Sequence, residues 1–398
     1  MEPDVLPRPP EPPLRDVRVL DLSRLLPGPF CTLILADLGA QVDKVEDPHV
    51  GDYLRLFPPH RNGLGGRFCA LNRSKRSLCL DLKQPAGREA LLRLLPRYQV
   101  LVEGFRPGVL DRLGLGPKDL LARHPSLVIC SLSGYGQDGP YRDRAGHDIN
   151  YLALSGVLGL SGADPKDPPH PLPVQLADVG GGALWAAVGI LAALLAARRT
   201  GCGRHLDVSL CEGALSFLLP DFGQLDAGAP DPVRGQELLT GGAACYGVYR
   251  TACGRYLAVG ALEPKFWLAF NRALGRAADP AELLAPPAEQ ARIRQEIQAI
   301  LGQRSRDEWE QVFAEVDACV EPVLSLQEVR QHPLHQARGL FFSTGGPDPV
   351  PQVRTPLTPR DPTATPPPRL GEHSEQILAE GGFSPAEIEA LRQSGVVR

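Results

Sequence analysis

The chain has 398 residues, a formal net charge of −4 and 43% hydrophobic residues, which suits one large or two medium domains with substantial cores. The mild acidity gives no reason to expect nucleic acid or an anionic membrane as a partner. The nine cysteines are scattered, with no CxxC pair and no histidine at metal-ligand spacing, so neither a disulfide framework nor a zinc site is supported, and a reducing cytoplasm is the simplest compartment.

The N-terminal half alternates β-rich and helical segments. Residues 1–15 are rich in proline and charge, lack the apolar core of a signal peptide and are expected to form a flexible arm. Strands are then predicted at Val17–Leu22, Ala40–Glu46, Ser77–Leu82, Val100–Glu103 and Leu127–Leu132. The helices predicted between them end near Leu38, cover Ala86–Leu95 and begin at Gly108. This alternation favours an α/β fold with a mostly parallel sheet covered on both faces.

An uncharged apolar run extends from Gly180 to Ala197. Its length is close to that of a membrane span, but it is rich in alanine and glycine and only weakly hydrophobic. A buried helix is therefore the preferred interpretation.

The second half of the chain no longer alternates strands and helices in the same way. Glycine-rich loops begin at Gly223, an apparent hairpin joins Tyr246–Thr251 to Arg255–Val259, and helical stretches follow to about Val329. The proline-rich passage 345–368 predicts an extended connector, and Ser384 with Glu387 predicts a capping box that opens a C-terminal helix. We expect a large domain at 16–222, a smaller α+β domain at 223–335, a connector at 336–370, and a C-terminal helix within 371–398 that returns to the large domain.

Two common kinds of active site are disfavoured. A dinucleotide-binding turn needs glycines with free backbone N–H groups, whereas Gly28 in the first predicted βα turn is flanked by Pro27 and Pro29. A nucleophile elbow needs a glycine before its serine, and Ser133 lacks one. Nicotinamide, flavin and serine-hydrolase chemistry are therefore not expected.

Basic residues gather around the second predicted βαβ unit. They are Arg73, Lys75, Arg76, Lys83, Arg106 and Arg112. Arg106 lies in a tight turn after a strand, at the carboxyl end where ligands of open α/β sheets bind. The cluster could hold phosphate groups or could be a solvated charged rim.

A histidine and a carboxylate about 30 residues apart are the best candidates for proton transfer. His147 lies in loop-like sequence, and the ordinary pKa of histidine suits a group that takes and returns a proton; a surface or core histidine is the alternative. Asp178 precedes the apolar run, so it could be a helix N-cap, a ligand-facing carboxylate or both, with the glycines after it leaving N–H groups free to face an anion. Glu263 precedes Pro264 at another predicted helix start.

The whole pattern resembles the family III CoA-transferases of the CaiB/BaiF type, from about Asp16 to the C-terminal helix. The matching strings are Pro27-Gly28-Pro29-Phe30, Leu35-Ala36-Asp37-Leu38-Gly39-Ala40, Lys75-Arg76-Ser77, Leu80-Asp81-Leu82-Lys83, Glu103-Gly104-Phe105-Arg106-Pro107-Gly108, Leu132-Ser133-Gly134-Tyr135-Gly136 and Thr200-Gly201-Cys202-Gly203. Within that superfamily, the strings from Gly146 to Tyr151 and from Gly260 to Pro264 resemble the α-methylacyl-CoA racemase branch.

This resemblance implies an enzyme that interconverts R and S 2-methylacyl-CoA thioesters through an enolate. The residues matching His147 and Asp178 are the acid/base pair of that branch, and those matching Asp148 and Glu263 support the histidine. Inversion of one carbon needs a base on each side, which agrees with two residue types held in opposite protonation states. No metal or redox cofactor is required, because CoA is part of the substrate.

The resemblance also implies the CoA site and the assembly. The implied CoA-binding residues are Leu80, Asp81, Leu82, Lys83, Gly104, Phe105, Arg106, Arg112, Gly146, Ile149, Asn150 and Tyr151. The implied fold is a Rossmann-like large domain with a small domain, in an interlocked homodimer with active sites between the two domains. One departure is that Asp47 stands where racemases often have an arginine for CoA, close to an insertion-like stretch, Tyr53–Phe68; Arg55 or Arg67 could substitute.

A true CoA-transferase is the main alternative. In that mechanism the carboxylate of Asp178 would attack the acyl-CoA and end as an aspartyl-CoA thioester. Such a reaction needs neither His147 nor Glu263, and the presence of both favours the racemase. A non-catalytic acyl-CoA-binding protein would be expected to lack one of these groups. The sequence does not indicate which acyl chain is used.

Overall fold

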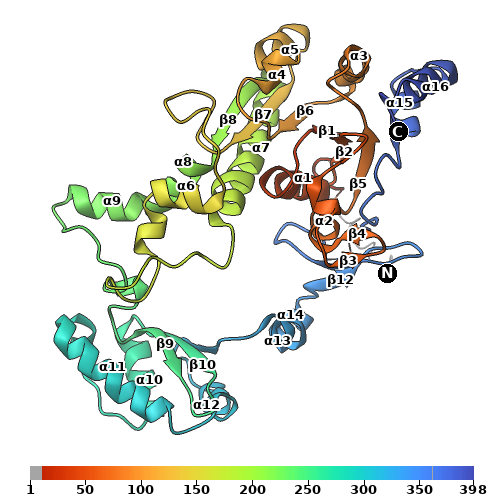
Figure 1. Ribbon diagram of the computed structural model, residues 1–398. Coiled ribbons are helices and arrows are strands. Elements are labelled where there is room, and N and C mark those ends of the chain that lie inside the picture. Colours follow the sequence, from red (N-terminus) through yellow and green to blue (C-terminus); the bar gives the residue numbers. More distant parts are fainter. Residues whose placement is uncertain (1–10, 361) are drawn as a thin grey trace, which may run out of the picture. The chain divides into compact units, whose positions relative to one another are not determined.

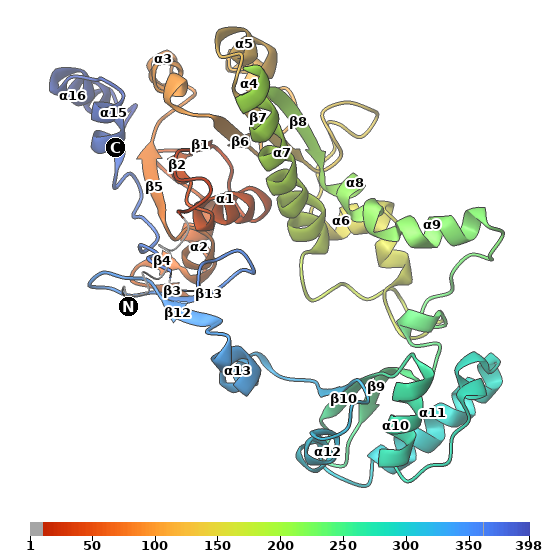
Figure 2. The same cartoon turned by 180° about the vertical axis from the view of Figure 1, so that it is seen from behind.

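The computed structural model describes residues 11–360 and 362–398, which form two compact units (Figures 1 and 2). Unit 1 comprises the described residues up to Ser155 together with Val174–Phe217 and Leu334–Arg398. Unit 2 comprises Gly156–Pro173 and Leu218–Pro333. Most of the arm expected at residues 1–15 lies outside the described residues. Leu14 is buried, and its N–H donates to the Leu38 carbonyl, so the chain is already attached to unit 1 at that point.

Unit 1 is built on a parallel six-stranded sheet in the order β5-β2-β1-β6-β7-β8. The strands are β1 (Arg18–Asp21), β2 (Gln41–Glu46), β5 (Lys75–Cys79), β6 (Val100–Glu103), β7 (Val128–Ser133) and β8 (Arg204–Ser209). The five strands predicted from the sequence are present, and β8 was missed. β1 lies at the centre, where Val19 is in register with Val42 on one side and Val100 on the other. The chain fills one half of the sheet and then the other, so the order reverses between β1 and β6.

Both faces of this sheet are buried. Leu20, Leu101 and Ile129 belong to one core, together with side chains of α3 (Pro85–Leu94), α4 (Val109–Arg112), α5 (Pro117–Arg123), α15 (Ser374–Glu380) and α16 (Pro385–Gln393). Their neighbours Val19 and Val100 point to the opposite face and are equally buried. There α1 (Pro27–Asp37) contacts α7 (Trp185–Thr200). The predicted α/β architecture is confirmed, and α16 begins with the predicted capping box.

The apolar run forms one continuous helix from Ala177 to Thr200, which is long and apolar enough to span a membrane by length and composition. It begins as a π-helix, η4 (Ala177–Leu184), and continues as α7. Only half of its most apolar window is buried. Trp185 and Val188 are exposed, so the predicted burial holds for one face of the helix.

Unit 2 has an antiparallel sheet in the order β11-β10-β9, formed by β9 (Tyr246–Arg250), β10 (Tyr256–Gly260) and β11 (Val320–Pro322). The predicted hairpin is confirmed as β9–β10. Its core contains Trp267 of α10 (Pro264–Ala273), Ile293 of α11 (Pro287–Leu301) and Trp309 of α12 (Arg306–Phe313). The unit also contains α9 (Leu219–Asp226) and α13 (Leu326–Gln331).

Two segments expected to be irregular contain small hairpins. In the proline-rich passage, β13 (Pro351–Val353) pairs with β12 (Phe341–Ser343), which follows α14 (Pro333–Ala337). Gln352 is held there because it accepts from Arg73 and donates to the Cys69 carbonyl. In the insertion-like stretch, β3 (His60–Arg61) pairs with β4 (Leu64–Gly65), followed by α2 (Gly66–Leu71). Part of the predicted extended connector is thus a paired strand that tertiary hydrogen bonds hold on unit 1.

Candidate active site

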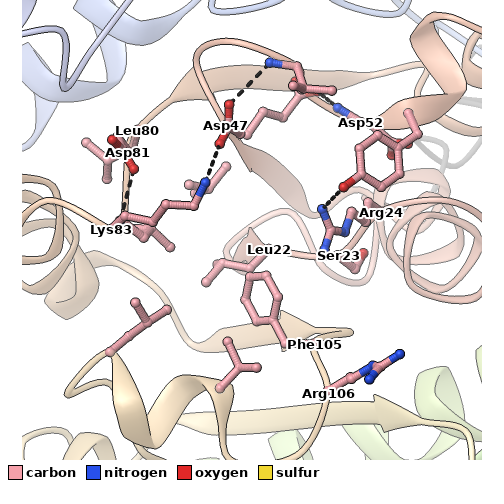
Figure 3. Close-up of a pocket in the computed structure, with 18 residues that line it drawn as sticks. Leu22, Ser23, Arg24, Asp47, Asp52, Leu80, Asp81, Lys83, Phe105 and Arg106 are labelled. Carbon is pink, nitrogen blue, oxygen red and sulfur yellow. Dashed lines mark hydrogen bonds and ion pairs between the residues drawn. The ribbon is translucent and has the colours of Figure 1, made fainter. Parts of the chain in front are cut away.

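A cavity of about 540 Å³ opens in unit 1 at the carboxyl ends of β1, β2, β5 and β6 (Figure 3). This is the place where the strand order reverses, and open parallel sheets bind ligands at such a point. Its lining residues are Leu22, Ser23, Arg24, Val45, Glu46, Asp47, Val50, Gly51, Asp52, Tyr53, Leu80, Asp81, Leu82, Lys83, Phe105, Arg106, Val109 and Leu113. Eight of these residues are aliphatic or phenylalanine, and seven are charged.

Half of the implied CoA-binding residues line this cavity. They are Leu80, Asp81, Leu82, Lys83, Phe105 and Arg106. The loop from Leu80 to Lys83 is fixed because the Asp81 N–H donates to the Val396 carbonyl and its carboxylate accepts from the Lys83 N–H. Gly104 and Arg112 are not among the lining residues.

Three other basic residues of the predicted cluster are paired with carboxylates of unit 1. Arg73 is buried and pairs with Asp37 at 2.6 Å, while Lys75 is buried beside Asp21. Arg76 pairs with Asp43 and Glu380. All three lie at or near the amino end of β5, opposite the end that forms the cavity, and none of them lines the cavity.

Neither arginine that was expected to replace the one missing at position 47 lines the cavity. Arg55 is buried, forms a two-pronged ion pair with Glu46 (2.7 and 2.8 Å) and stacks on the Phe68 ring with its guanidinium carbon 3.8 Å from the centroid. Arg67 is exposed and lies outside the cavity lining. Asp47 itself pairs with Lys83 at 3.6 Å.

The sequence analysis did not single out Arg24, Ser23 or Tyr53, yet all three line the cavity. In the view of Figure 3, Arg24 and Arg106 lie at the right and Lys83 at the left. Arg24 follows the carboxyl end of β1, and that position was the available signal, because residues directly after parallel strands are placed at the ligand-binding edge.

His147 occupies the N-cap position of α6 (Asp148–Leu154) and is exposed. Its extended backbone is fixed because its N–H donates to Asn150 Oδ1 at 3.0 Å and its carbonyl accepts from the Asn150 N–H. Among the residues that the structure describes, the N–H groups of Asp148 and Ile149 have no acceptor, as is usual in a first helical turn. The imidazole therefore stands beside two free backbone donors.

Asp178 lies in the first turn of η4, directly beside Asp148. Its backbone N–H donates to Asp148 Oδ1 at 2.9 Å. Burial, reinforced by the negative charge of Asp148, raises the pKa of Asp178 to about 7. Burial raises the pKa of Asp148 as well, although hydrogen bonds from the backbone of Asp178 and Ala177 oppose it. Asp178 can therefore both hold and release a proton near neutral pH.

One expectation for this segment was wrong. Asp178 is not the N-cap, because the helix already includes Ala177 and Leu176 has helical dihedral angles. Two glycines are needed there for close packing of the helices. A Cβ at Gly181 would lie 2.7 Å from the Ala214 backbone nitrogen, and one at Gly213 would collide with the Gly181 carbonyl, so η4 and α8 (Leu210–Leu215) touch backbone to backbone.

Tyr151 holds the loop before His147 and is acted on by the charges of Asp178 and Arg106. Its hydroxyl donates to the Gly146 carbonyl at 2.6 Å, which holds the loop before His147. Burial, with the negative charge of Asp178 as the next contribution, raises the pKa of Tyr151, and the positive charge of Arg106 opposes this rise. Asp178 and Arg106 are thus both within electrostatic range of one phenol.

Glu263 occupies the N-cap position of α10 in unit 2. His147, Asp148 and Asp178 belong to unit 1. The implied support of His147 by Glu263 therefore stays a prediction.

The sequence matches CoA-transferase family III over residues 14–374, and the chain belongs to that family. It is 40% identical to human alpha-methylacyl-CoA racemase over 390 residues, which cover 96% of this chain and 97% of the relative. It is 33% identical to succinyl-CoA–D-citramalate CoA-transferase of Chloroflexus aurantiacus, with 94% of each chain covered. A crystal structure of a CAIB/BAIF family protein from Brucella suis superimposes with a TM-score of 0.81 and 30% identity, covering 93% of this chain and 99% of that one.

Proposed function

We propose that the protein is a racemase that interconverts the R and S forms of 2-methylacyl-CoA thioesters by moving the α-proton. The observation that carries the proposal is the half-buried carboxyl of Asp178, with a pKa of about 7, in a residue whose backbone N–H donates to Asp148, next to His147. The similarity to a racemase over nearly the whole chain supports the same reaction.

In the proposed reaction, ionised Asp178 takes the α-proton from one face of the substrate. The electrons of the C–H bond form an enolate, whose charge lies on the thioester oxygen. The free N–H groups of Asp148 and Ile149 are suitable donors to that oxygen. Protonated His147 then delivers a proton to the opposite face of the α-carbon, which inverts it. The reverse direction uses the same two groups with their roles exchanged, and proton exchange with solvent restores the starting state.

The cavity at the carboxyl edge of the sheet is the proposed site for the CoA part of the substrate. Arg106 lies on its wall, and the positive charge of Arg106 also acts on Tyr151, whose hydroxyl holds the loop before His147. Leu22, Leu80 and Phe105 provide apolar surface for the nucleotide base. CoA enters as part of the substrate, and this reaction needs no further cofactor.

A CoA-transferase mechanism is the second candidate, favoured by the family match and by relatives with that activity. It would use Asp178 as a nucleophile, which must be ionised to attack. A pKa of about 7 leaves a large share of this carboxyl protonated at neutral pH. That property suits proton transfer better than nucleophilic attack.

Hydrogen exchange at the α-carbon distinguishes the two mechanisms. One enantiomer of a 2-methylacyl-CoA is incubated with the protein in deuterated water, without any acceptor acid. Deuterium uptake with loss of optical purity is expected, and His147→Ala and Asp178→Ala should each lower it at least about 100-fold. His60→Ala, at an exposed histidine outside the cavity lining, is the control. No exchange, with CoA moving only after a free acid is added, would establish the transferase instead.

We further propose a homodimer of the interlocked kind and a cytoplasmic location. The exposed apolar side chains of Trp185, Val188 and Leu195 on α7 support a subunit interface. Light scattering coupled to gel filtration should give twice the chain mass of 42.9 kDa. A monomer at micromolar concentration would contradict the assembly.

A further inference from the structure

Two of the three cations on the cavity wall are not paired with a carboxylate. Lys83 is neutralised in part by Asp47. Within the described part of the chain, neither Arg24 nor Arg106 forms an ion pair. Of these two guanidinium groups, that of Arg24 is held against a neighbouring side chain of the cavity wall, Tyr53.

The turn that carries Arg24 is fixed at both of its neighbours. The Ser23 N–H donates to Asp21 Oδ1 at 2.9 Å, and the Ser23 carbonyl accepts from Lys44 Nζ at 2.7 Å. Leu25 has φ of 66°, a left-handed conformation that costs about 1–3 kcal/mol for a residue with a branched side chain. Such a conformation persists only where its surroundings hold it in place.

A buried ion pair holds this turn. The Leu25 N–H donates to Asp52 Oδ1 at 3.1 Å, and the other oxygen of Asp52 lies 3.0 Å from Lys44 Nζ. Both side chains are fully buried. Burial disfavours the charged lysine, but the carboxylates of Asp21 and Asp52 outweigh it and raise the pKa of Lys44. Lys44 therefore joins the turn at Ser23 to the loop at Asp52.

The same loop places Tyr53 against Arg24. Asp52 caps the short helix η1 (Tyr53–Arg55) by accepting from the Leu54 N–H at 3.0 Å. Arg24 Nη1 donates to the Tyr53 hydroxyl at 2.9 Å, and its guanidinium carbon lies 4.8 Å from the ring centroid. One face of the guanidinium is thus oriented by an aromatic ring, while Arg24 remains exposed at the cavity wall.

We propose that Arg24, oriented by Tyr53 and positioned by the Lys44–Asp52 pair, binds a phosphate of the nucleotide end of CoA. It would thereby replace the arginine that is absent at position 47. A planar guanidinium presents paired N–H donors that match phosphate oxygens, and only one of its donors is used by Tyr53. This inference rests on the proposed acyl-CoA substrate. It adds a phosphate contact made by Arg24, which is oriented by Tyr53 of the insertion-like stretch.

The test compares a substrate with and without the nucleotide. Racemisation is measured with a 2-methylacyl-CoA and with the corresponding pantetheine thioester, which lacks all nucleotide phosphates. Arg24→Gln should raise KM for the CoA ester about 10- to 100-fold, the range for a lost charge-assisted hydrogen bond, and should not raise it for the pantetheine thioester. Arg67→Gln, at an exposed arginine outside the cavity lining, is the matched control.

Two further variants test the positioning. Tyr53→Phe removes only the hydroxyl and should raise KM for the CoA ester a few-fold, again with no change for the pantetheine thioester. Asp52→Asn should show the same selectivity for the CoA ester. An equal change for both thioesters, or no change in Arg24→Gln, would overturn the proposal.

Direct binding separates this inference from the proposed reaction. Calorimetric titration with CoA alone requires no turnover, and Arg24→Gln should weaken the affinity by the same factor. If the wild-type protein binds CoA but exchanges no α-proton, the racemase proposal fails while the phosphate contact stands. If the affinity for CoA is unchanged in Arg24→Gln, the phosphate contact fails whatever reaction is catalysed.

Discussion

The carboxylate of Asp148 accepts the backbone N–H of Asp178 at 2.9 Å, which brings the negative charge of Asp148 to the first turn of the helix that carries Asp178. Burial and this like charge together raise the pKa of Asp178 to about 7. The pair therefore sets the pH range in which Asp178 can exchange a proton with a substrate.

The pH profile should depend on Asp148. In the direction in which Asp178 removes the proton, kcat/KM is expected to rise with pH through about 7, because the carboxylate must be ionised. In the opposite direction Asp178 must be protonated, so kcat/KM should fall as the pH rises through the same range. Asp148→Asn keeps a hydrogen-bond acceptor but removes the like charge, so both limbs should move to lower pH. Exchange rates of each enantiomer between pH 5 and 9 measure this shift, and unchanged limbs would contradict the coupling.

Asp178 should reduce stability above neutral pH. The pKa of Asp178 is higher in the folded protein, so between its ordinary value of 3.8 and about 7 the folded state binds more protons than the unfolded state. The contribution of Asp178 to the free energy of unfolding therefore falls as pH rises through that window and stays reduced above it. Asp178→Asn should raise the free energy of unfolding at pH 8 by up to about 4 kcal/mol, with a smaller gain at pH 5. Thermal unfolding of Asp178→Asn and of Asp138→Asn, an exposed control, checks the prediction.

Gly146 should not tolerate a side chain. A Cβ there would lie 2.6 Å from the Tyr151 ring and 2.8 Å from the Tyr135 hydroxyl, and the two rings already pack edge to face at 5.1 Å. The loop before His147 would have to move, so Gly146→Ala should reduce racemisation at least about tenfold. Gly159→Ala is the control, because a Cβ at that position meets nothing within 4 Å. Equal activity of the two variants would show that the loop can shift without loss.

Arg55 should matter for stability rather than for recognition of CoA. Arg55→Met leaves the buried carboxylate of Glu46 without its partner and should cost about 3–5 kcal/mol of unfolding free energy. Adding Glu46→Gln to that variant should recover part of the loss. Urea unfolding of the single and double variants, with Arg67→Met as a control, measures both effects. A fully stable Arg55→Met would refute the structural role.

The strands of unit 1 were predictable wherever both of their faces are buried. β6 and β7 have runs of apolar residues, β1 and β2 contain buried valines, and β5 ends in buried Leu78 and Cys79; the sequence analysis located all five to within a few residues. β8 was missed because it has the polar sequence Arg204-His205-Leu206-Asp207-Val208-Ser209 and is only partly buried. Its place in the sheet depends on pairing with β7, a contact distant in sequence.

The site was predictable only in part, for similar reasons. His147, Asp178 and the loop at Lys83 were found from motifs that are continuous in the sequence. No motif connects Arg55 with Glu46 or Arg24 with Tyr53, so the ion pair of the first two and the hydrogen bond of the second two were not predicted. Burial decides which of several arginines is free to meet a ligand, and burial is a property of the tertiary structure.

The backbone contact between η4 and α8 couples two positions that lie far apart in the sequence. Gly181 and Gly213 exclude each other's side chains, so neither position can accept even a methyl group unless the helices separate. Separation would move the first turn that carries Asp178. The place of this carboxylate in the chain therefore depends on the absence of a side chain at position 213, far along the sequence from Asp178 itself.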